Sequence, residues 1–299
     1  VHMNISHTAK SLRKFLAIAT VAATTLVSAS TVANTSVWKV SKGDDHIYVG
    51  GTVHILPEDQ FPLPTEFEEA YKSSDAIVLE TKLPDPEDQA TQVAMMQRFS
   101  YSDGQRLSKV LSKDTFNSLG EYLADFGANV QQLDGFKPGF VITMMAMMEA
   151  QRAQLAGEGV DLYFSNRATT DNKPIEYLES MEFQMDLIAN IGKNNEDTLI
   201  RSTLSQMGSF KEMMLALLPA WRSGEVNKID ELAVKPVAKE DPKTFKAMFT
   251  DRNENWVPLI EAMFNDEDRE FILVGVGHLA GKDNVLQLLE KKGYKVSQL

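Results

Sequence analysis

The stretch FILVGVGH at residues 271–278 joins four consecutive apolar residues to a glycine-rich turn that ends in a histidine. An apolar run of this length, bounded by glycine, is typical of a buried strand. A related stretch, YVGGTVH at residues 48–54, lies near the start of the chain and also ends in Gly-x-x-His. Sites in α/β sheets gather beyond the carboxyl ends of the strands. The duplicated pattern therefore predicts one α/β sheet in which His54 and His278 follow two strands and face one site.

The rest of the sequence favours the same α/β class. Further strands are expected in short apolar or β-prone runs at residues 38–41, 46–51, 76–79, 175–178 and 294–296. Helices are expected at residues 66–73, 160–168 and 282–292, and within the longer stretches 86–155, 180–233 and 243–264. A loop is expected between Pro236 and Pro242.

The spacing of the two Gly-x-x-His turns bears on the domain organisation. They lie about 220 residues apart, so they can share one site only if the chain folds as a single domain. We therefore expect a central mixed sheet, a strand with a Gly-x-x-His turn at each end of the chain, and a large helical insertion between them.

The composition limits the classes of function. The 299 residues are 43% hydrophobic and 24% charged, which is ordinary globular composition. The formal net charge of −12 argues against nucleic acid and anionic lipid as main partners, since proteins bind both through clustered Lys and Arg. The sequence has no cysteine, which excludes disulfides, thiolate metal sites, a cysteine nucleophile and a lipidated cysteine.

The first 33 residues have the organisation of a secretory signal. Three basic residues precede an apolar run at residues 15–27, and small residues at 31–33 allow cleavage after Ala33. This run is shorter than the roughly 20 residues that span a bilayer, which favours a cleaved signal over a retained anchor. We expect a mature domain at residues 34–299 that is periplasmic or secreted, without a stable membrane anchor. Val1 and His2, before the first Met, are treated as a remnant of expression.

Carboxylates accompany the two histidines at the ends of predicted strands. Glu80 and Glu179 each close an apolar run, so each is expected at the same edge of the sheet as His54 and His278. Where thiolates are absent, neutral imidazole and carboxylate are the usual ligands of a divalent metal. His46, within the expected hairpin, has no matching context, and we interpret it as structural.

Ordered motifs along the chain resemble those of the TraB/PrgY/GumN family. They are Gly51-Thr52-Val53-His54, the strand ending at Glu80, Gly159-Val160-Asp161, Leu178-Glu179, Arg252-Asn253 with Trp256, and Gly275-Val276-Gly277-His278-Leu279. The resemblance implies a fold similar to the erythromycin-esterase and ChaN-like group, whose relatives include the Tiki membrane metalloproteases. It also implies that His54 and His278 are metal ligands, with Glu80 as their carboxylate partner. The sequence has no His-Glu-x-x-His helix, so distant segments must assemble the metal site.

The resulting hypothesis is a metal-dependent hydrolase that acts on a peptide or small-molecule substrate at a peptide or ester bond. A divalent ion bound by His54, Glu80 and His278 would acidify a water molecule and polarise a carbonyl group. Imidazole and carboxylate accept Zn, Mn, Co or Fe, so the identity of the metal stays open.

Three further residues are predicted to take part in catalysis. Glu179 is expected to be the general base of the hydrolase. Arg252, beside Asn253, is expected either to stabilise the developing oxyanion or to brace Glu80.

Two alternatives remain at this point. A metal-free esterase would use the same histidines and glutamates as general acid and base. A non-catalytic periplasmic binding protein would use the same polar cleft, together with the Met-rich stretch at residues 141–148, to hold a peptide or haem.

Overall fold

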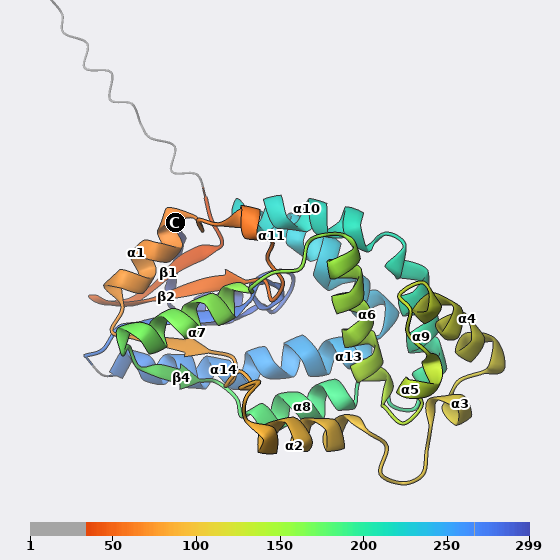
Figure 1. The fold of residues 1–299 in the computed structure, drawn as a ribbon. Helices are drawn as coiled ribbons and strands as arrows, with labels where there is room; N and C mark the ends of the chain where they lie inside the picture. The colour runs from red at the N-terminus through yellow and green to blue at the C-terminus, as the bar shows by residue number, and fades with distance from the viewer. Residues whose placement is uncertain (1–33, 266) are drawn as a thin grey trace, which may run out of the picture. The chain divides into compact units, whose positions relative to one another are not determined.

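A mixed β-sheet lies at the centre of the fold (Figure 1). The computed structural model describes residues 34–265 and 267–299, and the expected signal at residues 1–33 lies outside this range. Within the described residues, six strands pair in the order β4-β3-β5-β2-β1-β6. They are β1 (Val37–Lys42), β2 (Asp45–Thr52), β3 (Ala76–Leu79), β4 (Ile175–Tyr177), β5 (Glu270–Gly275) and β6 (Lys295–Gln298). Strands β2, β5, β3 and β4 run parallel, whereas β1 is antiparallel to both β2 and β6.

Strand β5 contains the apolar run that predicted the sheet. Phe271 and Leu273 belong to one buried cluster, whereas Ile272 and Val274 belong to another. Successive side chains of a strand point to opposite faces, so the sheet has a core on each face. Parallel strands covered on both faces are apolar at every position, which explains why β5 shows no alternation with polar residues.

Helices cover both faces of this sheet (Figure 1). Helices α1, α7 and α10 contribute to the cluster on one face, and α14 and α15 contribute to the other. Their bounds are Thr65–Ser73, Val160–Asp171 and Phe210–Arg222 for the first three, and Asp251–Ala262 and Val285–Lys291 for the last two. On the first face, Phe67 and Phe164 contact Phe271 with ring centroids 6.2 and 5.5 Å away. The layers are therefore helix, sheet and helix.

The large helical insertion predicted between the two Gly-x-x-His units is present. It includes α2 (Gln89–Phe99), α3 (Leu107–Val110), α4 (Lys113–Ala124), α5 (Val130–Leu133), α6 (Pro138–Arg152), α8 (Met181–Ala189) and α9 (Glu196–Met207). Figure 1 shows α4, α5, α6 and α9 beyond one end of the sheet. These helices have a buried cluster of their own around Leu119, Val141 and Met145. The described chain nevertheless folds as one compact unit, as expected.

The prediction of a loop between Pro236 and Pro242 was wrong, because this segment is helical. It contains α11 (Val226–Ile229), the π-helical turn η2 (Asp230–Val234), α12 (Lys235–Glu240), α13 (Pro242–Phe245) and a second π-helical turn, η3 (Lys246–Thr250). Each proline lies within the first two positions of its helix. Pro242 follows the non-helical residue Asp241, where the backbone N–H has no intrahelical partner, so this proline begins α13 without breaking a hydrogen bond. Pro236 follows η2 directly, within a continuous helical run.

The remaining elements are short. Three of them are turns of 3₁₀ helix: η1 (Glu58–Gln60), η4 (Met263–Asn265) and η5 (Val276–Leu279). The turn η5 contains His278 of the second Gly-x-x-His motif. None of the helices in residues 34–265 or 267–299 combines the length and the apolarity needed to cross a membrane.

Candidate functional site

The parallel strands end within two residues of one another and bring the predicted site residues to one edge of the sheet. Thr52 at the end of β2 pairs with Gly275 at the end of β5. Leu79 at the end of β3 pairs with Leu273 of β5 and with Tyr177 of β4. The residues that follow these strands therefore meet, as the strand-end argument predicted.

Gly275 lies where His54, Glu80 and His278 meet. A β-carbon on this glycine would lie 3.2 Å from Oε1 of Glu80, 3.6 Å from Nε2 of His54 and 3.8 Å from Cδ2 of His278. The backbone N–H of Gly275 donates to Oε1 of Glu80 over 2.7 Å. A glycine at this position thus leaves space between three polar side chains and orients one of them.

His278 is buried and has a hydrogen-bond partner on each ring nitrogen. Its Nδ1 lies 2.6 Å from Oδ1 of Asn253, and its Nε2 lies 3.0 Å from Nη1 of Arg252. Because a guanidinium only donates, Nε2 must accept and Nδ1 must hold the proton. Burial lowers the pKa of His278 to about 3, and Arg252 adds to this effect while Glu80 opposes it. The imidazole is therefore neutral in the physiological range.

Arg252 uses all of its donors within the protein. Its Nε donates to Oε1 of Glu179 over 2.9 Å. Its Nη1 lies 3.2 Å from the carbonyl oxygen of Met248, besides contacting His278. Its Nη2 donates to Oε2 of Glu80 over 2.5 Å and to Oε2 of Glu179 over 2.9 Å. A guanidinium has five N–H groups, so none is left for a substrate oxygen, and this geometry favours the bracing role over the oxyanion role.

The carboxylate of Glu179 likewise has hydrogen-bond donors on both of its oxygens. Besides Arg252, it accepts from Nε1 of Trp256 over 2.9 Å and from Nε2 of Gln184 over 3.3 Å. Its side chain is 8% exposed. A general base needs a lone pair within reach of the proton that it removes. The contacts of Glu179 instead suit a residue that holds Arg252 in position.

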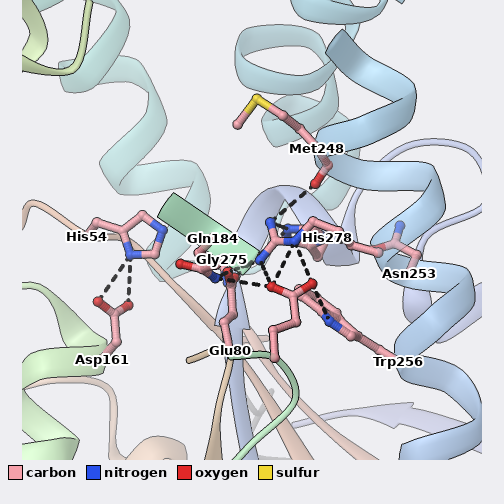
Figure 2. Close-up of polar contacts among 11 residues, drawn as sticks. His54, Glu80, Asp161, Gln184, Met248, Asn253, Trp256, Gly275 and His278 are labelled. Atoms are coloured by element: carbon pink, nitrogen blue, oxygen red, sulfur yellow. Dashed lines mark hydrogen bonds and ion pairs between the residues drawn. The ribbon is translucent and has the colours of Figure 1, made fainter. Parts of the chain in front are cut away.

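His54 differs from His278 because its side chain is 66% exposed. Its Nδ1 lies 3.1 Å from both carboxylate oxygens of Asp161, at the start of α7. This carboxylate raises the pKa of His54 above its ordinary value. Figure 2 shows His54 and Asp161 on one side of Glu80, with His278, Asn253 and Trp256 on the other.

The contact between His54 and Asp161 depends on a close approach of two backbone segments. A β-carbon on Gly159 would lie 2.5 Å from the carbonyl oxygen of His54. The N–H of Val160 donates to the carbonyl oxygen of Val53 over 3.0 Å. Sequence reasoning gave Asp161 no role, although the motif Gly159-Val160-Asp161 contained both the acid and the glycine that admits it.

Glu80 connects the exposed and buried parts of the site. Its Oε2 accepts from Arg252 and, over 3.0 Å, from Nε2 of Gln184. Burial by itself opposes ionisation of this carboxyl group, but neighbouring charges and the N–H of Gly275 outweigh it and lower its pKa to about 2. Of these charges, the guanidinium of Arg252 is permanent. Glu80 is therefore an anion across the physiological range.

Two cavities border this cluster of residues. One, of about 30 Å³, is lined by His54, Glu80, Asp161, Gln184, Thr52, Thr81, Leu79, Leu83 and Leu273. The other, of about 540 Å³, lies between the end of α8 and the α13–η3 segment, and its lining includes Phe183 and Met248. Met248 also accepts from Arg252 through its carbonyl oxygen. The small cavity is the one that the polar side chains of the site enclose.

The sequence matches the model of a known protein family. The family model described as TraB/PrgY/gumN matches residues 36–298. The chain belongs to the TraB/PrgY/gumN family. Among the similar proteins is the uncharacterized protein YbaP of Escherichia coli K12, which is 22% identical over 254 residues, or 83% of this chain and 89% of YbaP. YbaP of Shigella flexneri has the same identity and coverage. No solved structure matches the chain.

For this TraB/PrgY/gumN domain, the donors predicted to hold a metal are only partly available. The lone pair of His278 Nε2 already accepts from Arg252. His54 Nε2 and Glu80 Oε1 remain, with Oε1 accepting from Gly275. Within residues 34–265 and 267–299, no group of three or more His, Cys, Asp or Glu side chains has the spacing of a metal site. A three-residue metal site therefore requires Arg252 to move, and the divalent ion stays a prediction.

Proposed function

We propose that this TraB/PrgY/gumN family member hydrolyses carboxylic ester or amide bonds and that His54 is the base that activates water. The observation behind this proposal is the pairing of His54 with Asp161 beside Glu80 at a small cavity. When His54 is deprotonated and Nδ1 donates to Asp161, the imidazole has a lone pair on Nε2, which lies on the Gly275 side. This is the geometry of a base oriented by a carboxylate.

In the proposed reaction His54 transfers one proton from the attacking water to the leaving group. Nε2 of His54 takes a proton from water as the water oxygen attacks the carbonyl carbon of the substrate. When the tetrahedral intermediate collapses, the C–O or C–N bond breaks and His54 returns the proton to the leaving oxygen or nitrogen. The products are a carboxylic acid and an alcohol or an amine.

The buried residues support this chemistry indirectly. Arg252 is held by Glu179 and contacts His278, and it fixes the carboxylate of Glu80. Glu80 is one of the charges that favour the protonated form of His54. A fixed anion near the imidazole stabilises the imidazolium that forms in the transition state.

The test is hydrolysis of a panel of esters and peptides by purified protein. His54→Asn should lower kcat by about a hundred-fold or more, the usual contribution of a positioned base. The control is His46→Asn, which changes a histidine of β2 near the hairpin turn and should leave kcat unchanged. Absence of turnover by the wild type across the panel would reject the enzyme and favour the alternative binding protein for a peptide or haem.

A second candidate is the metal-dependent form of the same hydrolase, with Zn, Mn, Co or Fe. Two observations favour it. Three carboxylates lie at the site: Glu80 and Glu179 pair with Arg252, and Asp161 pairs with His54. Both imidazoles also have an oxygen acceptor on Nδ1, an arrangement common among histidines that bind metal through Nε2. His54 and Glu80 would hold the ion, which would supply an acidified water.

Metal analysis separates the two candidates. Protein purified from the periplasm is assayed for bound metal and for turnover, before and after dialysis against a chelator. Full turnover by metal-free protein supports the base mechanism of His54. Turnover that is lost with the metal and restored by Zn, Mn, Co or Fe supports the metal-dependent form.

The location and the boundaries of the mature protein are part of the same proposal. A signal at residues 10–33 predicts a mature chain that begins at Asn34 in the periplasm or outside the cell. Intact mass after expression in a Gram-negative host tests it. A membrane-bound product that retains residues 15–27 would contradict it.

A further inference from the structure

Two buried hydroxyl groups border the small cavity and have no partner within the described residues. They are Oγ1 of Thr52 and Oγ1 of Thr81. The two residues are 2% and 7% exposed, and both line the cavity of about 30 Å³ beside His54 and Glu80. Neither threonine is used by the chemistry described above.

An unpaired buried hydroxyl is unfavourable, and folded proteins rarely keep one. Most buried polar side-chain atoms bond to another protein group or to an ordered water molecule. A hydroxyl that moves from water to a protein interior without a new hydrogen bond loses its hydrogen bonds to water and gains none in return. Two such groups at the same cavity therefore indicate a bound molecule that both can contact.

The size and the lining of the cavity define that molecule. A volume of about 30 Å³ exceeds the roughly 10–15 Å³ that one water molecule requires, but it is far too small for an organic ligand. The apolar part of the lining comes from Leu79, Leu83 and Leu273. A buried water molecule typically makes about three hydrogen bonds, and Thr52, Thr81 and His54 offer that number.

We infer that Thr52 and Thr81 bind the water molecule that His54 deprotonates. This inference rests on the proposed hydrolase function. One threonine hydroxyl can donate to the water oxygen and the other can accept one water proton, which leaves the second proton for His54 and the second lone pair of the oxygen for attack on the carbonyl carbon. The threonines then orient the nucleophile, while His54 and Asp161 move its proton.

The positions of both threonines in the sequence fit this role. Thr52 is the last residue of β2, two residues before His54, and Thr81 follows Glu80 directly after β3. The strands β2 and β3 both pair with β5, on opposite sides of it. The same strand ends that position the base and the anion therefore position the two hydroxyls.

The test combines a high-resolution crystal structure with the kinetics of isosteric variants. Thr52→Val and Thr81→Val keep the branched shape and remove only the hydroxyl. Each should lower kcat at least about ten-fold, whereas Thr52→Ser and Thr81→Ser should retain most of kcat. The melting temperature should not fall, because neither hydroxyl has a protein partner to lose. The control is buried Thr115→Val, which removes a hydroxyl bonded to Ser112 and should lower the melting temperature without changing kcat.

The crystal structures supply a readout that does not depend on turnover. A water molecule bonded to both hydroxyls in the wild type, and lost in the double valine variant, supports the inference. A wild-type cavity without such a water, or valine variants with unchanged kcat, would overturn it. A wild type that holds this water but hydrolyses no substrate would reject the proposed function alone.

Discussion

Nη1 of Arg252 lies 3.0 Å from Nε2 of His278, at the distance of a hydrogen bond from a cation to a neutral imidazole. This contact makes the second Gly-x-x-His histidine an acceptor. The two histidine motifs are alike in sequence, yet they place one imidazole in a buried network and the other at an exposed surface. The motif thus fixes the position of each histidine and leaves its chemical role to its partners.

Removal of the guanidinium should destabilise the fold. Arg252→Met leaves Glu80 and Glu179 buried without their cation, and breaking a buried ion pair in this way costs about 3–5 kcal/mol. The free energy of unfolding is measured in urea at neutral pH. The control is Arg201→Met, because Arg201 pairs with Asp197 at an exposed position and should contribute less than about 1 kcal/mol. Equal effects of the two variants would show that the buried network is not a source of stability.

Stability should also decrease in mild acid because of His278. Its folded pKa of about 3 lies below the ordinary value of 6.5, so the unfolded chain binds a proton that the folded chain excludes. The contribution of His278 is complete above pH 6.5 and is lost as pH falls from 6.5 toward 3. The slope should approach about 1.4 kcal/mol per pH unit for this one group.

The matched variant for this acid effect is His278→Gln. It should flatten the dependence of the unfolding free energy on pH between 6.5 and about 5.5, where the carboxyl group of Glu80 has not yet begun to titrate in either the folded or the unfolded chain. His54 does not interfere, since its raised pKa places its own contribution above pH 6.5. An unchanged slope in His278→Gln would assign the acid effect to other groups.

Sequence reasoning predicted the parts of the site that local patterns encode. Apolar runs ending in Gly-x-x-His or in glutamate located the strand ends, and these ends bring His54, Glu80 and His278 together around Gly275. The roles of Arg252 and Glu179 could not be read in this way, because they depend on how many hydrogen bonds each group already makes. Counting donors and acceptors requires the folded structure.

The partner of His54 shows a second limit of sequence reasoning. Asp161 lies 107 residues further along the chain, in the first turn of helix α7. Nothing in the spacing of the two residues indicates that they meet. The close approach of Gly159 to the backbone of His54 explains the pairing, and it is a property of the packed backbone.

Gly159→Ala should therefore impair the site through the backbone. Its methyl group would lie against the carbonyl oxygen of His54, so α7 must shift and Asp161 must move away from Nδ1. We expect a loss of about 1–3 kcal/mol of stability, as for other overpacked positions, together with a large decrease in kcat. Gly208→Ala is the control, because a β-carbon there would meet nothing within 4 Å. Normal kcat in Gly159→Ala would show that Asp161 need not contact His54.

The pH dependence of turnover tests the role of Asp161 most directly. If His54 acts as the base, kcat/KM should rise with pH through the pKa of His54 in the free enzyme. Asp161 raises this pKa, so the acid limb of the wild type should lie above pH 6.5. In Asp161→Asn the negative charge is lost, and the limb should move to lower pH by at least one unit.

The same substitution should also lower the plateau of kcat/KM, because an amide does not stabilise the imidazolium that forms at His54 as a carboxylate does. The control is Asp44→Asn in the exposed turn between β1 and β2, which should leave both the limb and the plateau in place. A merely structural role for Asp161 would lower activity equally at every pH, without moving the limb. A limb that stays at the same pH in Asp161→Asn would therefore remove Asp161 from the mechanism, even if kcat falls.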